Sequence, residues 1–379
     1  MSQEALKQRI AAPGPKKILT LDGGGIRGMM TVEVLAGIEQ ILRQKMNNNR
    51  LVLADWFDFF AGTSTGAIIA TCLSLGMSTD EIRSFYLESG KEMFDKAFLL
   101  RRFRYKYEDE KLAGKLKEVF NKFDKSVGNV TLGSDKLRTL LMMVMRNVST
   151  DSPWPLSNNP FAKYNQQDRK DCNLNLPLWQ LVRASTAAPV YFPPEVINTG
   201  RHEFVFVDGG ITTYNNPSFQ AFLMATTEPY NLNWQAGEDK LLVVSIGTGT
   251  SPGANTDLNP EEMNLLYNAG SIPSALMYAA LNEQDFLCRT FGNCLAGDPL
   301  DREVGDMIGK KGPVSPKLFT YVRYNAELTR EGLDALGLSD IKPEDVQKLD
   351  STDHIKELKR VGQAVVARKV RPEHFTAFI

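Results

Sequence analysis

The chain has 379 residues, of which 42% are hydrophobic and 23% are charged, a composition typical of a folded protein with one large domain or two ordinary ones. Its 44 Lys and Arg residues nearly balance its 45 Asp and Glu residues, so no overall positive field attracts nucleic acid, and we expect no nucleic acid polymer as a partner. Four cysteines without a C-x-x-C pair and three histidines argue against a disulfide framework and against a zinc or His-rich metal site.

The N-terminal residues 1–15 are polar, and we expect them to form a flexible segment. They include Glu4 and lack the continuous apolar core of a secretory signal. No later segment of the sequence reaches the ~18 consecutive apolar residues of a membrane-spanning helix. The sequence therefore predicts an intracellular, cytoplasmic protein.

Two strand–turn–helix units follow in succession. Residues 17–21 form an apolar run expected to be a buried strand, which enters the glycine loop LDGGGIRG at 21–28 and then a helix. A second strand, roughly 57–61, enters the turn GTSTG at 62–66 and an apolar helix at 67–73. This alternation predicts a three-layer α/β/α fold with a largely parallel central sheet, in which ligands bind at the carboxyl ends of the strands.

Three later apolar runs are also expected to be strands, and the first two of them end in glycine: 204–207, 241–246 and 319–322. From about residue 339 the sequence is typical of charged helix with a single apolar stripe, which favours a helix packed on the domain surface. We therefore predict a main domain over 16–330 and a C-terminal helical extension over 331–379 that packs on it.

The turn at 62–66 matches G-x-S-x-G, the nucleophile elbow. In that motif, glycines permit a sharp strand-to-helix turn that exposes a serine hydroxyl, and the helix N-terminus stabilises negative charge nearby. The strand and helix expected on either side of Ser64 provide the context that the motif requires. Ser64 is therefore the candidate nucleophile.

A serine hydroxyl needs a base, because it is a weak nucleophile at its own pKa. His354 and His374 fit the chain order of a Ser-Asp-His triad but lie in charged helical or terminal sequence, and His202 lies before a strand, at its wrong end. Asp208 follows a predicted strand and precedes a glycine pair. A Ser64–Asp208 dyad is favoured, and a Ser-His-Asp esterase is the alternative.

The glycine loop has a second interpretation. Gly23, Gly25 and Gly28 match the G-x-G-x-x-G pattern of dinucleotide-binding turns. A dehydrogenase or nucleotide-binding protein would need an acidic residue at the end of the second strand, where this chain has the serine turn instead. A lipid-binding scaffold without activity is a third alternative, which an intact Ser64 and Asp208 disfavour.

Five segments together resemble, in the same order, the signature blocks of the patatin-like phospholipases: residues 22–28, 62–66, 184–193, 208–210 and 245–249. The resemblance covers roughly residues 17–324. It implies a lipid acyl hydrolase whose fold is related to the catalytic domain of cytosolic phospholipase A2, so that 16–330 would be the catalytic domain. It also implies a phospholipid substrate and chemistry without a metal or organic cofactor.

The resemblance also implies a role for each matching residue. Ser64 would be the nucleophile and Asp208 the base of a catalytic dyad. Backbone N–H groups of Gly23, Gly24 and Gly25 would form the oxyanion hole, and Arg27 matches an arginine of the family loop and is expected to bind substrate. Since a carboxylate is a weaker base than imidazole, we expect partial desolvation to raise the pKa of Asp208.

Location and regulation follow from the same resemblance. Residues 98–107 mix basic and aromatic side chains, which suits transient contact with the anionic inner face of a membrane. A solvated excursion of the chain is the alternative for this segment. Some intracellular bacterial members of the family are antiviral effectors that a cyclic nucleotide signal switches on, and the missing export signal fits that branch. A cyclic nucleotide activator and a homo-oligomer are the corresponding expectations.

Overall fold

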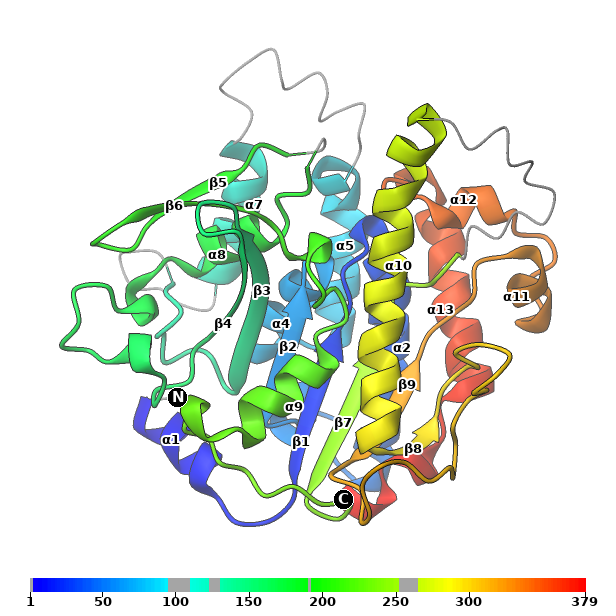
Figure 1. Cartoon of the computed structure of the whole chain (residues 1–379), viewed down its shortest axis with the longest axis horizontal. Helices are drawn as coiled ribbons and strands as arrows, with labels where there is room; N and C mark the ends of the chain where they lie inside the picture. The colour runs from blue at the N-terminus through cyan, green and yellow to red at the C-terminus, as the bar shows by residue number, and fades with distance from the viewer. Residues whose placement is uncertain (1–2, 95–109, 123–129, 190–191, 252–264) are drawn as a thin grey trace.

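The computed structural model describes residues 3–94, 110–122, 130–189, 192–251 and 265–379 (Figure 1). Within these ranges, nine strands form one mixed sheet in the order β5-β6-β3-β2-β1-β7-β9-β8, with β4 paired to β3. The strands are β1 (Lys16–Leu21), β2 (Phe59–Thr63), β3 (Leu140–Asn147), β4 (Ser152–Ser157), β5 (Glu195–Asn198), β6 (Glu203–Asp208), β7 (Leu241–Ile246), β8 (Asn293–Ala296) and β9 (Thr320–Tyr324). Pairing is parallel from β3 through β8 and antiparallel at β4, β5 and β6.

Helices flank the sheet on both sides (Figure 1). They are α1 (Gln3–Ala11), α2 (Gly28–Lys45), α3 (Leu53–Trp56), α4 (Thr65–Ser74), α5 (Thr79–Phe94), α7 (Glu110–Asn121), α8 (Leu178–Ser185), α9 (Ser218–Thr226), α10 (Leu265–Phe291), α11 (Arg330–Ala335), α12 (Pro343–Gln347) and α13 (Ile355–Lys369). Within the described ranges, no helix combines the length and the apolar character needed to cross a bilayer.

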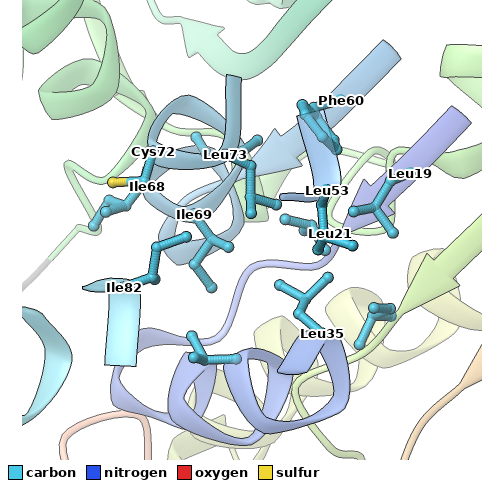
Figure 2. Packing of buried hydrophobic residues seen from close by; sticks show 14 of the residues in the cluster. Leu19, Leu21, Leu35, Leu53, Phe60, Ile68, Ile69, Cys72, Leu73 and Ile82 are labelled. Carbon is cyan, nitrogen blue, oxygen red and sulfur yellow. The ribbon is translucent and has the colours of Figure 1, made fainter. Parts of the chain in front are cut away.

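Side chains of the central strands point alternately to the two faces of the sheet, and both faces are buried. On one face, Leu19 of β1 and Phe60 of β2 belong to the apolar cluster that includes α2, α4 and α13. Figure 2 shows these side chains packed with Leu35 of α2 and Ile69 of α4. On the other face, residues such as Ile18 pack with α1 and α9. Two apolar clusters around one mostly parallel sheet confirm the predicted three-layer α/β fold.

The N-terminal region differs from the expected flexible segment. Residues Gln3–Ala11 form α1, because Leu6 and Ile10 lie four residues apart, on one helix face, and are buried in the second apolar cluster. Arg9 adds a hydrogen bond from Nη2 to the carbonyl of Phe57, 2.7 Å away. The helix therefore packs against the sheet rather than extending from it.

The C-terminal helices share the core of the first face. Leu358, Val361 and Val365 of α13 are fully buried in the same cluster as the central strands, and α13 lies beside α2 (Figure 1). Their spacing matches the apolar stripe expected from the sequence. The division into a catalytic domain and an extension stays a prediction, because this packing is continuous.

Candidate active site

Ser64 lies in a sharp turn between β2 and α4. Its backbone dihedral angles are φ 54° and ψ −123°, a conformation that side-chain-bearing residues rarely adopt. A Cβ on Gly66 would lie 2.2 Å from the carbonyl oxygen of Leu21, so the turn needs glycine to pack against the end of β1. This is the geometry of a nucleophile elbow, which presents Ser64 at the carboxyl end of the sheet.

The structure brings Ser64 and Asp208 into direct contact. Asp208 ends β6, and its Oδ2 accepts a hydrogen bond from Ser64 Oγ at 2.7 Å. Its Oδ1 accepts a bond from the N–H of Gly210 at 2.6 Å. Burial raises the pKa of Asp208 to about 6, although both hydrogen bonds oppose the rise. The shift makes this carboxylate a stronger base than an exposed aspartate.

The histidines have other partners. His374 Nδ1 lies 2.7 Å from the hydroxyl of Tyr324, and burial lowers the pKa of this imidazole. His354 lies beside Asp345, and His202 stacks near a phenylalanine at the start of β6. All three histidines belong to the described residues, and none is hydrogen-bonded to Ser64 or Asp208. The geometry therefore favours the dyad over the Ser-His-Asp alternative.

Ser185, at the end of α8, holds the backbone of the nucleophile, a contact that our motif analysis did not foresee. Its Oγ accepts a hydrogen bond from the N–H of Ser64 at 3.0 Å and donates one to the carbonyl of Val144 at 2.6 Å. Ser185 belongs to the block 184–193, of which residues 190 and 191 lie outside the described residues. The only sequence feature that indicates a role for Ser185 is its place in the signature segment 184–193.

The glycine loop continues β1 and lies beside the elbow. The N–H of Gly23 donates to the carbonyl of Asn215 at 3.1 Å, so this donor is occupied and the structure differs here from the expected oxyanion hole. For the N–H groups of Gly24 and Gly25, no acceptor lies within hydrogen-bonding distance among the described residues. These two N–H groups are the donors that the loop keeps available.

Arg27 follows the three glycines within the loop, and its guanidinium is only partly hydrogen-bonded. Its Nη1 donates to the carbonyl of Gln347 at 3.1 Å, whereas its Nε is buried without a partner among the described residues. Burial lowers the pKa of Arg27 to about 10, and the nearby carboxylate of Asp22 opposes this shift. Arg27 therefore stays cationic at neutral pH and retains an unused donor.

Comparison with known proteins identifies the family. The model of the family described as patatin-like phospholipase matches residues 19–222, more than half of the chain. The chain belongs to the patatin-like phospholipase family. This membership in a family of serine lipid acyl hydrolases argues against a dehydrogenase built on the glycine loop.

Individual patatin-like proteins resemble most of the chain. Patatin-like protein 1 of Arabidopsis thaliana is 28% identical over 325 residues, which cover 74% of this chain and 75% of that protein. Patatin-T5 of Solanum tuberosum is 26% identical over 321 residues, or 74% and 77% of the two chains. Among solved structures, human GIVD cytosolic phospholipase A2 aligns with a TM-score of 0.40 and 11% identity over 96% of this chain and 63% of that one.

Proposed function

We propose that the protein is a phospholipase of the A type, which cleaves fatty-acyl esters of membrane phospholipids with Ser64 as nucleophile and Asp208 as base. The observation that carries the proposal is the 2.7 Å hydrogen bond between Ser64 Oγ and Asp208 Oδ2 on a strained elbow. Membership in the patatin-like phospholipase family supports the choice of a lipid ester as substrate.

Acylation begins when Asp208 accepts the hydroxyl proton of Ser64 and Oγ bonds to the ester carbonyl carbon. The carbonyl oxygen becomes an oxyanion, for which the proposed donors are the N–H groups of Gly24 and Gly25, which have no acceptor in the described part of the chain. Removal of one such donor typically lowers kcat by 10²–10³. When the tetrahedral intermediate collapses, the carbon–oxygen bond breaks and Asp208 returns the proton to the leaving lysophospholipid.

Deacylation reuses the same groups. Asp208 takes a proton from a water molecule, whose oxygen attacks the acyl carbon bound to Ser64. The second intermediate releases the fatty acid, and Asp208 returns the proton to Ser64 Oγ. Because a buried carboxylate with a pKa near 6 is mostly ionised at neutral pH, the base is ready at the start of each half-reaction.

Arg27 is the proposed contact for the phosphate of the lipid. It is cationic at neutral pH, and its buried Nε has no partner among the described residues. A guanidinium suits a phosphate because its planar donors match two phosphate oxygens. Its place in the glycine loop, shortly after Gly25, puts this charge next to the donors proposed for the oxyanion.

The test is to incubate the protein with mixed phospholipids and identify the products by mass. Wild type should release fatty acid and lysophospholipid, whereas Ser64→Ala and Asp208→Asn should each lose activity by ~10³ or more. Alanine variants of His202, His354 and His374 should keep wild-type activity. Phospholipid hydrolysis by Ser64→Ala would contradict the proposed mechanism. Loss of hydrolysis in one histidine variant that still folds would show that the site is a triad and not a dyad.

The expectations on location, assembly and regulation stay predictions. Residues 98–107, proposed for membrane contact, lie outside the described residues. The cyclic nucleotide activator rests on the family resemblance alone. Phospholipid hydrolysis measured with and without cyclic dinucleotides tests the predicted activator. Equal rates in the two conditions would contradict it.

A further inference from the structure

A buried ion pair joins the residue before the three glycines of the glycine loop to a distant strand. Arg323 of β9 donates from Nη1 to Asp22 Oδ1 at 2.8 Å and from Nη2 to Asp22 Oδ2 at 2.6 Å. The side chains are 2% and 0% exposed. Asp22 directly precedes Gly23, so this contact lies at the start of the loop that carries the proposed oxyanion donors.

The guanidinium reaches Asp22 across another strand. β7 lies between β1 and β9 (Figure 1), and its Ser245 pairs in register with Thr20 on one side and Arg323 on the other. Arg323 Nη1 also donates to the hydroxyl of Ser245 at 2.7 Å. Ser245 of β7 therefore fixes the guanidinium of Arg323, which extends past β7 to bind the carboxylate of Asp22.

A second carboxylate supports the guanidinium from behind. Asp285 of α10 lies with its Oδ2 4.0 Å from Arg323 Nε. Asp285 also accepts bonds from Arg289 at 2.8 and 2.7 Å and from the hydroxyl of Tyr321 at 3.0 Å. Two carboxylates and two guanidiniums thus form one buried network, and among the described residues Asp22 is the only member of this network in the glycine loop.

The cost of such a pair indicates a role other than stability. Removing two charges from water is expensive, and buried ion pairs often contribute no more stability than an apolar pair would. Burial raises the pKa of Asp22, and the guanidinium of Arg323 opposes that rise. The role of the pair is to set orientation, because a bidentate Arg–carboxylate contact fixes the orientation of both groups.

The rest of the loop is fixed by contacts that converge on the same short segment. Thr248 Oγ donates to the carbonyl of Gly23 at 2.7 Å, and the N–H of Ile26 donates to the carbonyl of Leu349 at 3.0 Å. Between these anchors lie Gly24 and Gly25, whose N–H groups have no acceptor among the described residues. An oxyanion hole needs its donors held within about 0.5 Å of the productive geometry.

We propose that Arg323 is a positioning residue of the acyl-hydrolase reaction: by holding Asp22 in two hydrogen bonds, it aims the N–H groups of Gly24 and Gly25 at the oxyanion. The proposal rests on the function proposed above. Since these donors act on charge that exists only in the transition state, their misplacement lowers kcat and leaves KM nearly unchanged.

The experiment compares Arg323→Lys with Arg289→Lys, using a soluble short-chain ester. Both arginines are buried and make two hydrogen bonds to an aspartate, but only Arg323 contacts Asp22. We expect kcat of Arg323→Lys to fall by about 10², the effect of losing one oxyanion donor, with an unchanged KM. Arg289→Lys keeps a positive charge beside Asp285, and its kcat should fall by far less than that of Arg323→Lys. Equal kcat values in the two variants, or a change confined to KM, would overturn the proposal.

A second variant, in which both charges of the Asp22–Arg323 pair are removed, keeps the proposal testable if Arg323→Lys does not fold. The double variant Asp22→Asn with Arg323→Gln removes both charges of the pair together, so neither partner is left as an unpaired charge. We expect it to fold, by circular dichroism, and to have kcat at least about tenfold below wild type, because uncharged hydrogen bonds are about half as strong. Wild-type kcat in this variant, or failure of this variant also to fold, would assign the pair to stability and overturn the proposal.

Wild type and Ser64→Ala separate this proposal from the proposed function. If wild type hydrolyses the ester and Ser64→Ala does not, the serine mechanism stands and the Arg323 comparison concerns positioning alone. If wild type has no activity on short-chain esters or phospholipids, the proposed function fails before any Arg323 variant is measured.

Discussion

In the proposed mechanism, Asp208 does as a carboxylate what an imidazole does in most serine hydrolases. Its contacts explain how: Oδ1 is fixed by the N–H of Gly210, which leaves Oδ2 for the hydroxyl of Ser64. Burial disfavours the ionised carboxylate and raises its pKa to about 6. The base is therefore stronger than an exposed aspartate and still ionised at neutral pH.

This pKa predicts the pH dependence of the reaction. Asp208 accepts a proton only when ionised, so kcat/KM should rise about tenfold per pH unit below pH 6 and level off above it. The measurement is a pH–rate profile on a soluble ester. The residual activity of Asp208→Asn should lack this limb. A limb of the same midpoint in that variant would assign the titration to another group.

Some site residues could be predicted from the sequence and others could not. Ser64 and Asp208 follow predicted strands at glycine turns, where parallel topology brings strand ends together. Arg323 carries no motif, and its partner Asp22 lies 301 positions away. The sequence predicts the Gly23 N–H as an oxyanion donor, because a pattern of side chains does not reveal that this N–H is already bonded to a main-chain carbonyl, that of Asn215.

At the scale of elements, two strand-to-helix turns form the site, and the first is closed by a segment near the C-terminus. Gly25 has φ +59°, and a Cβ there would lie 2.3 Å from the carbonyl oxygen of Leu349. That same carbonyl accepts the N–H of Ile26. A shift of the glycine loop away from the elbow would therefore break the hydrogen bond between Ile26 and Leu349.

Gly25→Ala should displace the loop and lower kcat by about 10²–10³, the range for a lost oxyanion donor. Gly305→Ala is the matched control, because Gly305 has a similar φ of +62° but nothing within 4 Å of the added Cβ. Both variants cost about 1–2 kcal/mol in backbone strain. The measurements are kcat on a soluble ester and the thermal midpoint of each variant. Equal activity in both would show that crowding at Leu349 does not matter.

The elements that the sequence predicted differ in kind from those that it missed. β1, β2 and β7 are short apolar runs that lead into glycine-containing turns, and their observed bounds lie within two residues of the expected ones. β3, a methionine-rich apolar run, has no period that separates a buried strand from a helix. β4 contains Pro153 and Pro155, residues tolerated there because β4 pairs only with β3.

At the scale of the whole molecule, the C-terminal region contributes to the catalytic face. α13 packs on α2, and the segment before it supplies two carbonyls, from Gln347 to Arg27 and from Leu349 to Ile26. Leu358 of α13 is fully buried in the cluster that also contains the central strands. An extension built in this way cannot separate from the sheet without exposing that cluster and releasing the glycine loop.

The last prediction is that the C-terminal helices and the sheet unfold together. Calorimetry should show one transition, and ester hydrolysis should be lost at the same temperature. Leu358→Ala should lower the free energy of unfolding by about 2–5 kcal/mol, the usual cost of such a cavity, and move both midpoints equally. Lys356→Ala, an exposed position on the same helix, should change stability by no more than about 0.5 kcal/mol. A separate low-temperature transition in Leu358→Ala, with activity retained above it, would instead make residues 331–379 an independent unit.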